Sequence, residues 1–93
     1  MRSKVCVSGE HIMLGLQGNP HFCPVARAIR EQVPGASGVS VTCKSIYMDV
    51  GRQWFFRVPP RSVARFIERF DKDASGKPFN FYLEIPDEER GQP

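Results

Sequence analysis

The sequence predicts an α+β domain of ferredoxin-like β-α-β-β-α-β order, in which two helices pack on one face of a four-stranded, mostly antiparallel sheet. Three observations support this class. Two segments carry apolar residues at helical spacing, and four segments alternate apolar with polar residues or are rich in β-branched residues. The length of 93 residues suits a single domain with one core.

The first strand is predicted over residues 3–7 (SKVCV), where β-branched valines alternate with polar residues. Ser8 follows as a helix N-cap, with Glu10 in the first turn, so a short helical turn is expected over 9–15. The glycines at 15 and 18 end this turn and begin a loop.

The next helix is predicted to begin at Cys23-Pro24, because proline lacks the N–H that would be unpaired at the first helical position. An apolar face follows at helical spacing: Val25, Ala28, Ile29 and Val33. Pro34-Gly35 ends the helix.

A hairpin is predicted in the middle of the chain. One strand is expected over 39–48 and the return strand over 53–58, with a turn at 49–52 that contains a glycine. Alternation in the return strand separates two sets of side chains onto opposite faces: Trp54, Phe56 and Val58 on one, and Phe55 and Arg57 on the other.

The clearest amphipathic helix is predicted over 60–72, after Pro59-Pro60. Its apolar stripe consists of Val63, Phe66, Ile67 and Phe70. A last strand is expected over 79–85, which alternates strictly. The domain is therefore predicted over residues 1–85, followed by a flexible polar tail over 86–93.

Composition predicts a non-membrane, cytoplasmic protein without a cofactor. The net charge is +3, which is mildly basic, and the three cysteines cannot all pair within one chain. This cysteine usage suits a reducing compartment. No apolar run approaches membrane-spanning length, and the N-terminus lacks the apolar region of a signal peptide.

Cys23 and His21 form the first candidate site. A thiol at a helix N-terminus can be activated as a nucleophile, and a nearby histidine can act as its base. The alternative is that Cys23 only begins the helix, which we favour because no third group to orient the imidazole is evident. A metal site is not expected, since only His21 and Cys23 lie at ligand spacing.

Basic residues at helical spacing form the second candidate site. Arg61, Arg65 and Arg69 fall at i, i+4 and i+8, and Lys72 lies near the same stripe. Arg27 and Arg30 add charge to the earlier helix. Such stripes are typical of a solvated face or of a surface that binds an acidic partner.

The open face of the predicted sheet is a third candidate. RNA-recognition domains share the predicted element order and stack bases on aromatic residues of their central strands. Phe55, Arg57 and Tyr82 are the residues that we expect on this face. The glycine of the RNA-recognition motif is absent from RQWFFRV.

The segments EHI at 10–12, CPVARAI at 23–29 and FIERFD with FNFYL between 66 and 83 carry a family resemblance. Together they make the chain similar to a family of small uncharacterised phage and prophage proteins with a CPVALAI-like helix start. Arg27 stands where that pattern has an apolar residue. The resemblance implies a phage origin and a bacterial host, and no particular chemistry.

We therefore expect a non-enzymatic binding protein, because no nucleophile–base–orienter set or phosphate-binding glycine loop is evident. Its expected action, which rests on the phage resemblance, is to inhibit or modulate a host protein or protein–nucleic-acid complex, such as a defence complex in the manner of anti-CRISPR proteins. A nucleic-acid-binding domain and a thiol-dependent activity at Cys23 are the alternatives. The sequence leaves open whether the protein is a monomer or a homodimer.

Overall fold

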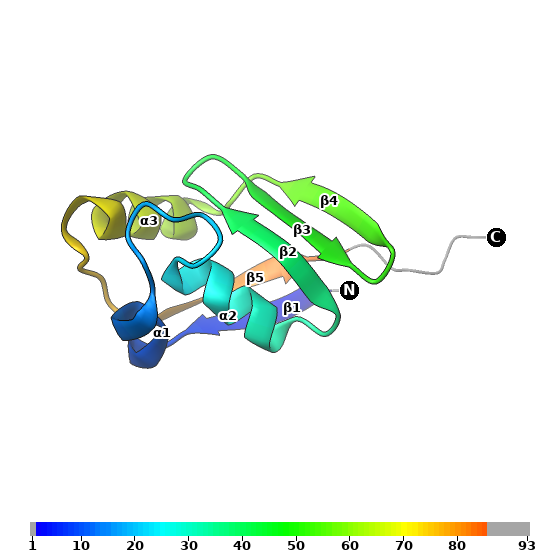
Figure 1. The fold of residues 1–93 in the computed structure, drawn as a ribbon, viewed down its shortest axis with the longest axis horizontal. Coiled ribbons are helices and arrows are strands. Elements are labelled where there is room, and N and C mark those ends of the chain that lie inside the picture. The colour runs from blue at the N-terminus through cyan, green and yellow to red at the C-terminus, as the bar shows by residue number, and fades with distance from the viewer. Residues whose placement is uncertain (1, 86–93) are drawn as a thin grey trace.

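The structure confirms the α+β class and contains more elements than predicted (Figure 1). The computed structural model describes residues 2–85, so the polar tail predicted over 86–93 lies outside the described residues. The elements are β1 (Arg2–Val7), α1 (Gly9–Leu14), α2 (Pro24–Gln32), β2 (Ala36–Val41), β3 (Ile46–Val50), β4 (Gln53–Arg57), α3 (Arg61–Asp73) and β5 (Phe79–Glu84). None of these helices is long and apolar enough to cross a bilayer.

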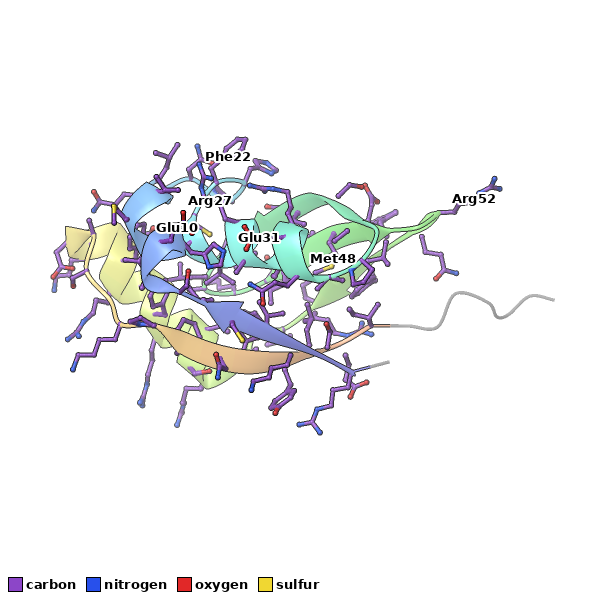
Figure 2. The ribbon with its side chains drawn as sticks, turned by 90° about the horizontal axis from the view of Figure 1, so that it is seen from below. Glu10, Phe22, Arg27, Glu31, Met48 and Arg52 are labelled. Carbon is purple, nitrogen blue, oxygen red and sulfur yellow. The ribbon has the colours of Figure 1, made fainter. Side chains whose placement is uncertain are left out.

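The strands described between residues 2 and 85 form two antiparallel sheets in place of the predicted single four-stranded sheet. β1 pairs with β5, and the other sheet has the order β2-β3-β4. Seen from below, β1 and β5 lie along one side of the molecule, and the tip of the β3–β4 hairpin, marked by Arg52, extends away from them (Figure 2). The α+β class is therefore confirmed, whereas the single four-stranded sheet of the predicted ferredoxin-like sandwich is not found among these strands.

The segment predicted as one strand over 39–48 is two strands joined by a tight turn. The N–H of Thr42 donates to the carbonyl of Ser45 at 2.8 Å. The Thr42 hydroxyl in turn accepts the N–H groups of Lys44 and Ser45, both at 3.1 Å. A threonine side chain thus closes a turn that holds neither glycine nor proline, which is why the sequence predicted a continuous strand.

Side chains at the free edges of β1 and β5 explain why the two sheets stay separate. The Gln32 amide on α2 accepts the Cys6 N–H and donates to the Cys6 carbonyl, both at 2.8 Å. On β5, the carbonyl of Glu84 accepts a 3.1 Å hydrogen bond from Nε of Arg57 on β4. Backbone groups satisfied in this way are not available to a neighbouring strand.

One core fills the space between the two sheets, α2 and α3. The predicted helix stripes are confirmed, and their buried members pack with strand residues from both sheets: Val25, Ala28, Ile29, Val33, Val63, Phe66, Ile67, Phe70, Val5, Val7, Val39, Val41, Ile46, Met48, Phe81 and Leu83. Figure 2 shows Met48 pointing into this interior. The core fixes the positions of α3 and the β3–β4 hairpin, which carry the surfaces described next.

Candidate functional site

A groove of about 450 Å³ lies between α3 and the loop that leads into β5. Its residues come from two short segments that the fold brings together: Ser62, Arg65, Phe66 and Arg69 on α3, and Gly76, Lys77, Pro78 and Phe79 after it. The helical members are three or four residues apart, so they line one face of α3. The groove therefore joins part of the predicted arginine stripe to residues that the stripe did not include.

Local backbone geometry brings the loop onto the helix. α3 ends at Ala74, which adopts the left-handed conformation with φ of 60° and turns the chain back. Two residues later, a Cβ on Gly76 would lie 2.5 Å from Cε2 of Phe66. A larger residue at this position would have to displace the buried Phe66 ring, so glycine permits the close approach of the loop. Phe66 and Phe79, with ring centroids 4.9 Å apart, form the aromatic floor of the groove.

The groove is positively charged. Arg65, Arg69 and Lys77 are exposed, and the described part of the chain contributes no carboxylate to the lining of the groove. The ion pair recorded within residues 2–85 is His11–Glu31, which involves none of these cations. Three cationic groups therefore face solvent around an aromatic floor.

The remaining predicted residues of the α3 stripe lie beside the groove. Lys72 lines an adjoining hollow of about 330 Å³ together with Glu68 and Asp73. Arg65 and Arg69 line this hollow too, so on that side the two groove arginines border charges of both signs. Arg61 is exposed at the first position of α3 and does not line either hollow. The structure thus gathers Arg65 and Arg69 with Lys77, a residue that the sequence did not single out.

Arg27 and Arg30, predicted as partner-binding residues, belong to a different surface on α2. They line a hollow of about 330 Å³ that also contains Glu10 and Glu31, so its charge is mixed. Their guanidinium carbons lie 6.0 and 5.0 Å from the centroid of the Phe22 ring, and Arg30 donates to the carbonyl of His21. Figure 2 shows Phe22, Arg27 and Glu31 together on this side. These two arginines therefore stabilise the loop between α1 and α2 through their contacts with Phe22 and His21.

The prediction that Phe55, Arg57 and Tyr82 share an open sheet face is wrong. Phe55 packs against the core, and the Arg57 guanidinium lies 4.8 Å from its ring centroid. Tyr82 is exposed on the other sheet, where Arg2 covers its ring at 4.2 Å. The alternation over 53–58 was correct, but the set with Trp54 and Phe56 is the one that faces outward.

The actual open face of the β2–β3–β4 sheet is aromatic. Tyr47, Trp54 and Phe56 are 41%, 66% and 44% exposed. Tyr47 lies opposite Phe56 in the β3–β4 register, with ring centroids 5.2 Å apart, and its centroid is 6.1 Å from that of Trp54. We call these three residues the aromatic face.

Cys23 and His21 do not form a reactive pair in the structure. Cys23 is the N-cap of α2 and is buried, and this burial raises the pKa of its thiol. Nδ1 of His21 donates to the carbonyl of Val39 at 3.1 Å, so this nitrogen serves the backbone. The geometry supports the structural interpretation of Cys23.

We therefore expect Cys23 to react with iodoacetamide more slowly than glutathione at pH 7, because a buried, protonated thiol is a poor nucleophile. Cys6 is exposed and serves as the internal reference. Peptide mass spectrometry of the folded protein should show Cys6 alkylated roughly tenfold or more faster than Cys23. Faster modification of Cys23 than of glutathione would revive a thiol-dependent activity.

A hydrogen-bonded cluster centred on His11, which the sequence did not single out, connects α1 to α2. Nδ1 of His11 accepts the Ser8 N–H at 2.9 Å and lies 3.0 Å from the Ser8 hydroxyl, while Nε2 lies 2.8 Å from Glu31. The Ser8 hydroxyl also accepts the His11 N–H at 3.3 Å, which makes a capping box. With Nδ1 accepting from the backbone, Nε2 carries the proton that is donated to Glu31. The three-residue spacing of Ser8 and His11 is the sequence signal, and the cluster stabilises the fold.

Three comparisons set this chain against protein-family models, curated proteins and solved structures, and none of them gives a match.

Proposed function

We propose that this protein is a non-enzymatic binding protein whose α3 groove contacts the phosphate backbone of nucleic acid, either free or within a host protein–nucleic-acid complex. The observation that carries this proposal is the groove itself. Arg65, Arg69 and Lys77 surround it, and none of the acidic residues described between positions 2 and 85 lines it. Arginine binds phosphate through two parallel N–H donors, and lysine adds a point charge.

The charge distribution supports a polyanionic partner. Residues 1–85 hold twelve of the thirteen lysines and arginines but only seven of the ten acidic residues, so their formal charge is +5. Arg65 repels Arg61 and Arg69 at i, i+4 spacing, at a cost of a few tenths of a kcal/mol per pair. Asp73 attracts Arg69 and offsets only part of this cost. Arg61 also opposes the dipole at the start of α3. A phosphate backbone would offset these costs.

Inhibition of a host complex is the biological setting that we propose for this binding, on the strength of the resemblance to phage proteins. A small basic protein can occupy the path that nucleic acid takes through such a complex. Affinity capture from a bacterial lysate, with and without nuclease, tests this setting. A partner that is retained only while nucleic acid is intact supports phosphate contact, and a partner that resists nuclease argues for a protein surface.

The groove leads to a quantitative expectation for salt dependence. Three cationic contacts should give a slope of log K against log [salt] of about −2 to −3, measured by fluorescence anisotropy of a labelled oligonucleotide. A random-sequence duplex and a single strand are both used, because phosphate contacts do not read sequence. Absence of binding at about 50 mM salt, or a flat salt dependence, would contradict the proposal.

A further inference from the structure

We infer that the aromatic face of the β3–β4 hairpin stacks unpaired bases, so that the nucleic acid is held as a single strand. This inference rests on the proposed function and adds a second surface to it. The face presents Tyr47, Trp54 and Phe56 as one contiguous set of exposed rings. Single-strand binding proteins combine such rings with a cationic track for the backbone.

The surroundings of the aromatic face favour bases over a protein surface. The outward positions beside the rings are polar, namely Ser37, Ser40 and Asp49. Val58, the residue directly after β4, is an exposed aliphatic residue near these rings in the chain. By contrast, the exposed aliphatic residues Met13, Leu14 and Leu16 lie at α1, at another part of the chain. Aromatic rings among polar groups suit base stacking, whereas the apolar centre of a protein interface also draws on residues such as methionine.

Charge around the rings also suits a polyanion. Lys44 lies in the β2–β3 turn, and Arg52 extends from the tip of the β3–β4 hairpin (Figure 2). The acidic residue of this face, Asp49, is directed onto β2: a Cβ on Gly38 would lie 2.8 Å from its Oδ2. The carboxylate is thus held away from Trp54, which lies opposite Asp49 in the register.

The aromatic face leads directly to the basic helix. β4 ends at Arg57, and α3 begins at Arg61 after Pro59 and Pro60 (Figure 1). The two surfaces are thus joined by only three residues, and we infer that a strand whose bases stack on Trp54 and Phe56 continues past Arg61 to the α3 groove. Stacking discriminates against duplex, because paired bases do not expose their faces.

The protein carries its own reporter for this inference, since Trp54 is the only tryptophan in the chain. We expect oligonucleotides of roughly a dozen nucleotides to quench Trp54 emission, whether they are DNA or RNA, and a duplex of the same strand length not to do so. Trp54→Ala and Phe56→Ala should each weaken single-strand binding about tenfold, measured by anisotropy of the labelled oligonucleotide. Val58→Ala, one residue beyond β4 and without a ring, should leave single-strand binding unchanged.

The outcomes separate this inference from the proposed function. Salt-dependent binding that is equal for single strand and duplex, with Trp54 emission unchanged, overturns the stacking inference and leaves the groove proposal standing. Quenching that survives charge reversal at Arg65 and Arg69 overturns the groove proposal and supports stacking. If Trp54→Ala removes capture of a host protein while single-strand affinity is unchanged, the face binds protein and the inference is wrong.

Discussion

Replacing Arg65 and Arg69 together by glutamate is expected to weaken nucleic-acid binding on the order of 100-fold at about 0.1 M salt. Both side chains line the α3 groove, and neither forms an ion pair within residues 2–85. The change removes two phosphate contacts and adds two repulsive charges. The slope of log K against log [salt] should therefore fall in magnitude by about 2.

The control for this variant carries the same change in charge on another surface. Arg2 and Lys4 are exposed on β1, which contributes no residue to the α3 groove, and Arg2→Glu with Lys4→Glu makes an equal reversal of charge. We expect this control to keep the salt slope and to lose less than about fivefold in affinity, since only long-range charge has changed. Equal losses in the two double variants would show that net charge, and not the groove, governs binding. Circular dichroism should show both variants folded, because exposed substitutions cost about 0.5 kcal/mol or less.

The helices could be predicted because their signals are local. Cys23-Pro24 at the start of α2 and the stripe of α3 that ends at Phe70 depend only on residues a few positions apart. The predicted helix over 60–72 lies within one residue of the observed Arg61–Asp73. The apolar face of each helix could be assigned because each has a single apolar stripe.

The strands were harder to predict, because individual side-chain contacts, some between residues far apart in the sequence, decide where they begin, end and pair. The turn at Thr42–Ser45 depends on one hydroxyl, and the free edge of β1 is closed by Gln32, twenty-six residues away. In β4 the alternation defines two sets of side chains, but both contain a phenylalanine, Phe55 and Phe56. Only the packing against the core decides that Phe55 points inward.

Only the helical side of the groove could be predicted from the sequence. Arg65 and Arg69 follow from the spacing along α3, which any helix would display. Lys77 joins them because Ala74 turns the chain and Gly76 lies against Phe66. The segment 74–78 contains glycine and proline, so the sequence identified it as the end of a helix and not as the wall of a site.

Phe66, in the floor of the groove, is expected to contribute both to the shape of the groove and to the stability of the fold. Phe66 is 8% exposed, and its ring lies against Phe70 and Phe79 at centroid distances of 5.9 and 4.9 Å. Phe66→Ala is expected to lower the free energy of unfolding by about 3–5 kcal/mol, through lost burial and the cavity left behind. That is a large share of the 5–15 kcal/mol typical of a domain. Urea denaturation followed by circular dichroism measures the change.

Phe22→Ala is the control for this truncation, because it removes the same ring from a side chain that is 46% exposed. We expect it to cost about 1 kcal/mol, chiefly its contact with Arg30. Phe66→Leu fills part of the cavity, so it should fold even if Phe66→Ala does not, at a cost of roughly 1–2 kcal/mol. If Phe66→Ala cost no more than Phe22→Ala, the ring would not be buried between helix and loop, and the α3 groove would lack its floor. If stability fell as expected while Phe66→Leu kept the salt slope of binding, the two roles would separate: the ring supports the loop that carries Lys77, and the cations hold the phosphates.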